Sequence, residues 1–342
     1  MIASAHSKHE KGVALIIVLG LVALIGVWAS TAAYEDMISL RRMENMQDGM
    51  RGTQASQSAF ALVIKILRED AQDSQQDDLE EVWAQKIPAF PIDQGTVSGE
   101  ILDANRFINV NDLVNSQGAV QADVEANIKL LFQRLELDVS LVNRLIDWID
   151  PNSSPYGAGG AEEPAYYDAA YSVKNRPLER WSELHMIKGF DDEVVRKLEN
   201  YLVVRASPPT VAAEVGGRAQ DQAAQATPAV TGGRTPININ TAPVEVMMAL
   251  FPLMSDADAQ AFIESRPYSA VNVAQQPWAK DVNVQGRLST VSDLFIVRTD
   301  ARFGRTALRE QFMVSRQGQS LKLESREKLE WNRGLQQEVE EK

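Results

Sequence analysis

The 342-residue sequence contains no cysteine and only three histidines. Without cysteine, neither a disulfide framework nor thiol chemistry is possible, and a zinc site built from His and Cys is excluded by number. Two of the histidines, His6 and His9, lie in the N-terminal leader, so a catalytic triad would have to use His185. No Gly-x-Ser-x-Gly motif accompanies that residue. The chain is therefore not expected to be an enzyme.

The sequence also has fewer basic than acidic residues. The chain has 34 Lys and Arg residues against 47 Asp and Glu residues, which gives a net charge of −13 at pH 7. Proteins that bind nucleic acid in bulk neutralise phosphates with Lys and Arg, so nucleic acid is not an expected partner. Hydrophobic residues make up 44% of the chain, an ordinary share for a globular core. The length allows a membrane helix plus one large or two ordinary domains.

Proline is absent before Pro88, which favours one long helix at the N-terminus. Uncharged residues run from Val13 to Ala33, long enough to cross a bilayer core of ~30 Å as a helix. Apolar residues then recur near helical spacing to about Arg68, so the helix is expected to continue from the membrane into a soluble domain. Lys8 and Lys11 precede the apolar run, and the positive-inside rule predicts a cytoplasmic leader and an exported body.

The leader before this helix has an unusual order. A secretory signal peptide carries its small-residue cleavage site after the apolar region, whereas Gly12 stands before it. Cleavage after Gly12 would remove the charged residues and keep the apolar helix, with Val13 as the new N-terminal residue. An ordinary signal anchor is the alternative for the same residues.

Beyond the long helix, the pattern indicates both helices and strands. Expected helices lie at about 120–135, 138–149, 179–203 and 243–266, and expected strands at 96–102, 295–298, 310–315 and 321–324. Turns around Gly304 and Gly318 would join the last strands into an antiparallel meander. Residues 206–236 have the Pro, Ala, Gly, Gln and Thr composition of a linker.

An acidic, Gly-rich loop at 150–175 separates two of the expected helical regions. Carboxylate and amide side chains gather there around Gly157, Gly159 and Gly160. Ca²⁺ takes six to eight oxygen ligands at roughly 2.3–2.6 Å, and a flexible loop lets backbone carbonyls join the carboxylates. The EF-hand pattern is absent, and a solvated acidic loop explains the composition alone. Loops longer than ~15 residues are usually either functional or disordered.

The leader, this loop and two Asn-rich segments, 107–111 and 237–241, together resemble the type II secretion system protein K family, a branch of the type IV pilin-like proteins. In pilin-like proteins a prepilin peptidase cuts after the leader glycine and methylates the next residue, which here are Gly12 and Val13. Most members carry Glu at the fifth mature position. That position is Ile17 here, a departure that marks the protein K branch.

The resemblance implies an α+β fold with a long N-terminal transmembrane helix, an antiparallel pilin-like sheet and a large inserted α-helical domain of SAM-like, helix-hairpin-helix type. The expected division is a cleaved leader at 1–12, a transmembrane segment at 13–33, the pilin-like helix and first strand at 34–104, the inserted domain at 105–285 with the linker 206–236 inside it, the C-terminal strands at 286–330 and a polar tail at 331–342.

The resemblance also implies a function. Such a protein is a minor pseudopilin, a structural subunit at the tip of a periplasmic pseudopilus that supports protein export across the outer membrane. The implied partners are other minor pseudopilins in a tip complex, the major pseudopilin and the prepilin peptidase. The implied location is the bacterial inner membrane, crossed once, with the C-terminal body in the periplasm. In ordinary subunits the fifth-position Glu neutralises the N-terminal amine of a neighbour, so Ile17 fits a first or tip position.

Members of this family bind calcium in the inserted region, so the resemblance makes Ca²⁺ the expected cofactor. The expected ligands are Asp150, Asn152, Glu162 and Asp168, with Asp147 and Glu163 as further candidates.

Two other functions share some of these features. A minor pilin of a type IV pilus would have the same leader and fold. A membrane-anchored helix-hairpin-helix protein would bind DNA through a Gly-rich turn and basic residues that contact phosphates. Here the turn 187–190 has one Lys and is followed by three acidic residues, and the second turn, at 252–256, has no glycine. These residues disfavour DNA binding.

Overall fold

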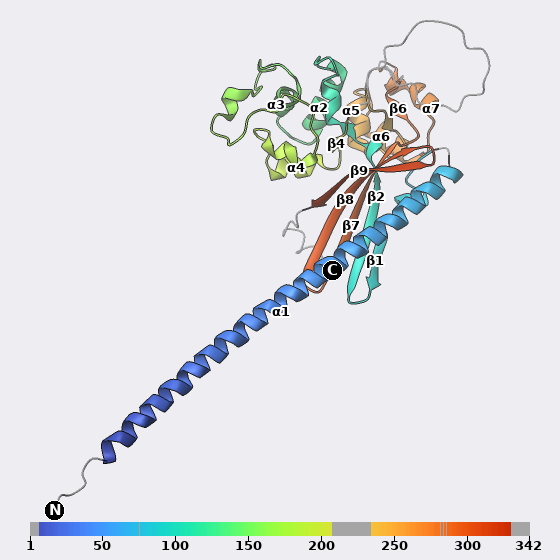
Figure 1. The fold of residues 1–342 in the computed structure, drawn as a ribbon. Helices are drawn as coiled ribbons and strands as arrows, with labels where there is room; N and C mark the ends of the chain where they lie inside the picture. The colour runs from blue at the N-terminus through green and yellow to red at the C-terminus, as the bar shows by residue number, and fades with distance from the viewer. Residues whose placement is uncertain are drawn as a thin grey trace, which may run out of the picture.

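The computed structural model describes residues 7–206 and 234–329, apart from Gln75, Asp281, Asn283 and Gln285. The first part of the expected leader, most of the expected linker and the expected polar tail lie outside these residues. A single helix, α1 (Ser7–Asp73), runs along the long axis of the molecule, and its N-terminal part projects beyond the rest of the fold (Figure 1). It is the one described helix that is long and apolar enough to cross a membrane. The predicted long helix is therefore present, and it ends a turn later than expected.

The second half of α1 lies on a five-stranded antiparallel sheet with the strand order β1-β2-β7-β8-β9. The strands are β1 (Ile87–Ile92), β2 (Gly95–Asp103), β7 (Leu294–Phe303), β8 (Thr306–Gln317) and β9 (Ser320–Leu329). The three C-terminal strands form the predicted meander. The strand β1 was not expected, because it contains Pro88 and Pro91. It lies at the sheet edge, where proline is tolerated since the missing N–H breaks no ladder.

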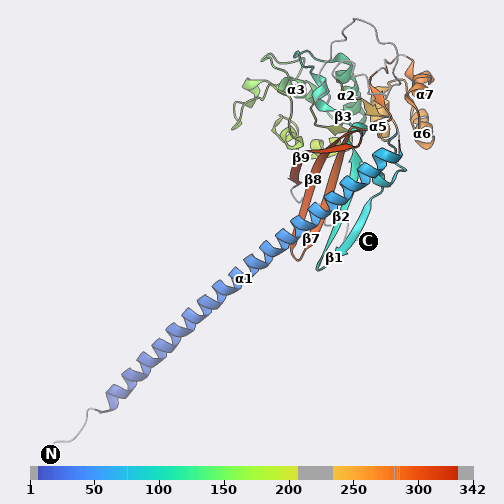
Figure 2. The ribbon, with the colours of Figure 1, turned by 45° about the vertical axis from the view of Figure 1, so that its right-hand side comes forward.

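Strands β2 and β7 are neighbours in the sheet, paired from Gly95 with Phe303 to Asp103 with Phe295. Everything between them in the sequence is thus an insertion into the pilin-like body. The insertion gathers at the end of the sheet farthest from the N-terminal end of α1, in both views (Figures 1 and 2). The expected α+β fold with an inserted helical domain is confirmed.

The described insertion has two lobes that share one hydrophobic core. Two short 3₁₀ turns, η2 (Ala104–Arg106) and η3 (Val110–Leu113), lead into the first lobe, which contains α2 (Ala122–Arg134), α3 (Ser140–Ile149), η4 (Glu163–Tyr166), η5 (Trp181–Met186) and α4 (Asp192–Leu198). The second lobe contains α5 (Val244–Leu250), α6 (Asp256–Glu264), α7 (Ala270–Ala274) and η6 (Pro277–Ala279). Another 3₁₀ turn, η1 (Val82–Ala84), lies between α1 and the sheet.

The two Asn-rich segments have the same role in the two lobes. Each contains a two-residue strand, β3 (Ile108–Asn109) or β5 (Ile237–Asn238), that pairs in parallel with a strand at the end of its lobe, β4 (Leu202–Val203) or β6 (Leu288–Ser289). The amide of Asn111 accepts from the backbone N–H of Leu178 and donates to its carbonyl, both at 2.8 Å. The amide of Asn240 makes the same two bonds to Tyr268, at 2.7 and 3.1 Å. A side-chain amide can satisfy both backbone groups of one residue, so each motif fastens a loop of its own lobe.

A buried polar cluster joins the helix, the sheet and the insertion. Arg316 on β8 donates to Asp70 at the end of α1 (2.8 Å) and to Asp77 in the next loop (2.6 Å). The backbone carbonyl of Asp77 accepts from Asn238 of the second lobe at 3.0 Å. The carboxylate of Glu81 also lies near those of Asp70 and Asp77. Arg316 supplies the positive charge that three neighbouring carboxylates require.

Candidate metal centre and apolar surfaces of the long helix

The acidic loop 150–175 follows α3, and three buried carboxylates lie in the loop and the helix end before it: Asp147 on α3, and Asp150 and Glu162 in the loop. Their side chains are 0%, 1% and 2% exposed. Helix α3 carries Asp147 in its last turn and ends one residue before Asp150, so the helix end fixes two of the three groups. Glu162 comes from the far side of the loop, just before η4.

Asp147 closes the loop. Its carboxylate accepts from the backbone N–H of Tyr156 at 2.7 Å and from that of Ala161 at 2.5 Å. Burial raises its pKa, and these two backbone bonds act against the rise. Both oxygens therefore already have donors, and Asp147 ties the loop backbone at Tyr156 and Ala161 to the last turn of α3.

Asp150 and Glu162 are different, because three of their four oxygens have no partner. One Asp150 oxygen accepts from the Asn152 backbone at 3.1 Å, but its second oxygen and both Glu162 oxygens are buried without a hydrogen-bond donor. Burial, helped by the charges of Asp147 and Asp150, raises the pKa of Glu162 to about 7. An unpaired buried carboxylate is costly unless a cation compensates it. The donor set, all hard oxygen, fits Ca²⁺.

The other three expected ligands are exposed. Asn152 uses its side-chain oxygen to accept from Ser154 N–H at 2.8 Å. Glu163 accepts from the Ser172 hydroxyl at 3.0 Å and from Val173 N–H at 3.2 Å, so it pins the return of the loop. Asp168 faces solvent. The structure does not bring these three side chains into the buried group, because their positions on the loop point outward.

Asn175, which the sequence reasoning did not select, lies beside this group. Its side-chain oxygen is buried without a partner, and its amide nitrogen donates to the Asn152 carbonyl at 3.0 Å. The Asn175 side chain also acts to lower the pKa of Glu162, against the larger effect of burial. Its backbone has a φ of +47°, a left-handed conformation in which asparagine is enriched. Nothing else in the sequence around Asn175 indicates that it lies beside Glu162.

Gly160 provides a test of the loop conformation. A Cβ at this position would lie 2.5 Å from an Asp147 oxygen and 2.7 Å from the Tyr156 backbone. Gly160→Ala is therefore expected to lower the stability of the first lobe by about 1–3 kcal/mol through forced displacement. Chemical denaturation followed by Trp fluorescence would measure it. Gly49→Ala, on α1, is the comparison for alanine in place of glycine, because a Cβ there would meet nothing and the backbone is helical, so no loss of stability is expected.

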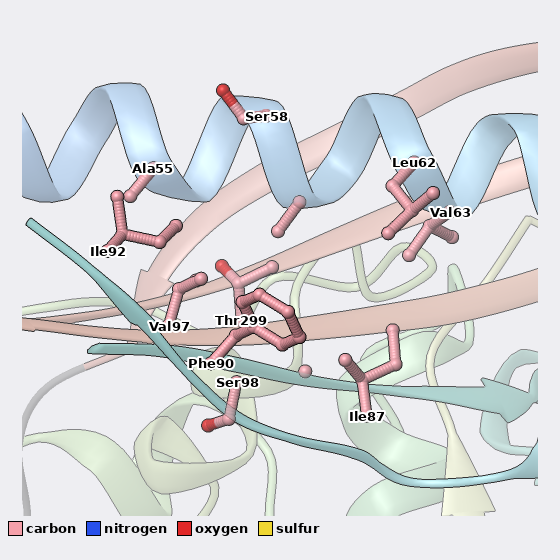
Figure 3. A pocket seen from close by; sticks show the side chains of 12 residues that line it. Ala55, Ser58, Leu62, Val63, Ile87, Phe90, Ile92, Val97, Ser98 and Thr299 are labelled. Atoms are coloured by element: carbon pink, nitrogen blue, oxygen red, sulfur yellow. The ribbon is translucent and has the colours of Figure 1, made fainter.

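The long helix exposes apolar side chains beyond the expected membrane segment. Tyr34, Leu40, Met43 and Met46 are each at least 60% exposed, although charged residues flank them. Further along, α1 and the β1–β2 hairpin enclose an apolar groove of about 240 Å³, lined by Leu62 and Val63 from the helix and by Phe90 and Val97 from the strands (Figure 3). Surface of this kind usually contacts another chain or a lipid.

The remaining residues selected from the sequence are His185 and the residues of the expected processing site, Gly12, Val13 and Ile17. His185 is exposed, with its Nδ1 3.4 Å from an Asp192 carboxylate oxygen. The expected cleavage point between Gly12 and Val13 lies within α1, and Val13 and Ile17 are exposed.

A long apolar helix that packs on an antiparallel sheet, with a helical domain inserted after the second strand, defines the protein as a membrane-anchored subunit of pilin-like class. The models of "Type II secretion system (T2SS), protein K" match residues 106–207 and 237–291, which are the two lobes. The chain belongs to the type II secretion system protein K family and is a minor pseudopilin of type II secretion.

Individual relatives agree. The chain is 24% identical over 344 aligned positions to type II secretion system protein K of Pectobacterium carotovorum, a match that covers 94% of this chain and 97% of the relative. It is 27% identical to protein K of Aeromonas hydrophila, over 57% of this chain and 63% of the relative. A solved structure of the GspK–GspI–GspJ complex from the enterotoxigenic Escherichia coli type 2 secretion system has the same fold, with a TM-score of 0.67, 22% identity, and coverage of 85% of this chain and all of that one.

Proposed function

We propose that this minor pseudopilin is the tip subunit of a periplasmic pseudopilus. The observation that supports this most directly is the position of the insertion, which caps the end of the pilin-like body opposite the N-terminal end of α1 (Figures 1 and 2). A bulky domain there would obstruct a subunit stacked above. Ile17 supports the same place, because a subunit without the fifth-position Glu lacks the group that pairs with a neighbour's amine.

The proposed partners are other minor pseudopilins and, below them, the major pseudopilin. The apolar side chains at 34–46 of α1 would pack against their helices, since charged residues around them argue against burial in lipid. In the proposed arrangement, a prepilin peptidase cleaves after Gly12, Val13 onward anchors the chain in the inner membrane, and the body lies in the periplasm. The role is structural rather than enzymatic.

The test is co-purification of the full-length chain in detergent with two other minor pseudopilins of the same system. Met43→Glu together with Met46→Glu is expected to reduce the recovered partners at least tenfold, because both substitutions place charge in a helix–helix contact. Glu44→Gln, on the same exposed turn, is the matched control. Equal recovery with all three proteins would refute the role of this stripe, and a failure of the unaltered chain to recover either partner would refute the tip complex.

We further propose that the acidic loop holds a Ca²⁺ ion. Asp150 and Glu162 would provide carboxylate oxygens and Asn175 an amide oxygen, while Asp147 keeps the loop closed. The support is the set of buried oxygens without donors. The ion would supply charge neutralisation and order in the loop, and no chemical reaction is implied.

A further inference from the structure

The acidic loop is fastened to a second feature of the first lobe, the turn 186–190, which starts at the last residue of η5 and leads toward α4. The Lys188 N–H donates to the Tyr166 hydroxyl at 3.1 Å, and the Lys188 ammonium donates to the Ala165 carbonyl at 3.3 Å. The Tyr171 hydroxyl donates to the Met186 carbonyl at 2.9 Å. Polar groups at two positions of this turn are thus bonded to the loop.

Arg144 on α3 makes the remaining link. Its Nε donates to the Gly159 carbonyl of the loop at 3.1 Å, and its Nη1 donates to the Lys188 carbonyl of the turn at 2.9 Å. The planar guanidinium holds its donors in a fixed fork, so one side chain sets the spacing between the two segments. Gly189, with a φ of +90°, leaves the room that Arg144 occupies.

The link runs close to the buried carboxylates. Gly159 is three residues before Glu162, and Arg144 is one helical turn before Asp147 on the same helix. Between the loop and the helix, Trp148 packs against Tyr166 and Tyr171, with ring centroids at 5.7 and 6.3 Å. A change in the loop that moves Tyr166 therefore breaks its bond to Lys188, and one that moves Gly159 breaks its bond to Arg144, the side chain that also holds the Lys188 carbonyl.

We propose that Arg144 is a positioning residue that couples calcium occupancy of the acidic loop to the order of the turn 186–190. The coupling rests on the proposed calcium site. With the ion bound, the repulsion among the carboxylates is relieved, the loop closes, and Arg144 and Tyr166 hold Lys188. Without the ion, the loop opens more often and the turn loses these partners. Because coupling is reciprocal, an ordered turn must also favour calcium binding.

The experiment is hydrogen exchange of the full-length chain in detergent, after chelation and with about 1 mM CaCl₂, the upper end of the Kd range of extracellular calcium modules. In the unaltered protein, calcium is expected to slow exchange at Lys188 at least tenfold. Arg144→Met and Arg144→Lys should both lose this protection and bind calcium at least fivefold more weakly by calorimetry. Arg144→Lys tests whether the two guanidinium donors are needed, since lysine retains the positive charge but cannot bridge both carbonyls in the same way. Arg196→Met, which removes an exposed charge from α4, should behave like the unaltered chain.

The outcomes separate the two proposals. Calcium binding with no change in exchange at Lys188 would overturn the coupling and leave the calcium site intact. Calorimetry without any binding to the unaltered chain would overturn the site and the coupling together. Protection that persists in Arg144→Lys would show that charge, not the two-carbonyl bridge, provides the coupling. That result would overturn the positioning role of the fork.

Discussion

Replacing Arg316 by methionine is expected to lower the free energy of unfolding of the pilin-like body by about 3–5 kcal/mol. The guanidinium is 6% exposed and pairs with Asp77 and Asp70, whose side chains are 2% and 11% exposed. Methionine fills similar volume, so the loss comes from two carboxylates left buried without a cation. The same cluster joins α1 to the second lobe, so both regions should lose protection.

The loss should depend on pH. Burial, with repulsion from Glu81 and Asp77, raises the pKa of Asp70 to about 6 even with Arg316 present, and burial raises the pKa of Asp77. A carboxyl whose folded-state pKa lies above its unfolded value near 3.8 stabilises the fold below that value, and this contribution is lost as pH rises through about 6. Without Arg316 the rise is larger. The deficit of the variant should therefore be smaller at pH 5 than at pH 7.5.

Urea denaturation at the two pH values measures this. The double variant Arg316→Met/Asp77→Asn should recover part of the loss, because it removes one of the unpaired charges. Arg305→Met, at an exposed turn of the same sheet, should change stability by no more than about 0.5 kcal/mol. A deficit that is the same at both pH values, or that the second substitution does not reduce, would contradict an electrostatic origin.

The role of Arg316 could not be predicted from the sequence, whereas other parts of the fold could. The long helix, the C-terminal meander and the inserted helices have local causes, namely periodicity and turn residues, and these were predicted. Arg316 and Asp77 are 239 positions apart, and nothing near either residue indicates the pair. The two-residue parallel strands are equally hidden, because pairing such as Ile108 with Leu202 depends on the packed lobe. Strand β1 was missed for another reason, since its prolines are permitted only by its edge position.

The acidic loop was likewise predictable in part: its composition marks the loop, but not which side chains turn inward. Composition drew attention to the loop, and the six expected ligands include Asp147, Asp150 and Glu162, the three of them that the structure buries. Which of the six turn inward depends on how Asp147 binds the backbone of Tyr156 and Ala161, a closure that spacing does not reveal. Asn175 is not among the expected ligands, because its approach to Glu162 depends on that closure.

Calcium should raise the melting temperature of the chelated full-length protein, and Glu162→Gln should abolish the rise. At a free Ca²⁺ concentration 100-fold above Kd, binding to the native state alone adds about 2.7 kcal/mol, which corresponds to roughly 5–10 °C for a domain of this size. Glutamine retains the shape of Glu162 but removes a charge that is buried without a donor. The chelated variant should therefore melt at or above the temperature of the chelated unaltered protein, while its response to calcium disappears.

Differential scanning calorimetry with EGTA and then with increasing CaCl₂ gives both quantities. Asp168→Asn is the matched control, because it removes a carboxylate from the same loop at an exposed position and should keep the full rise. The opposite signs of the two effects of Glu162→Gln distinguish a metal ligand from a structural carboxylate, whose loss would lower the melting temperature with or without calcium. An unaltered protein whose melting temperature stays constant through millimolar calcium would eliminate the ion from this loop. A full rise in Glu162→Gln would place the ion elsewhere.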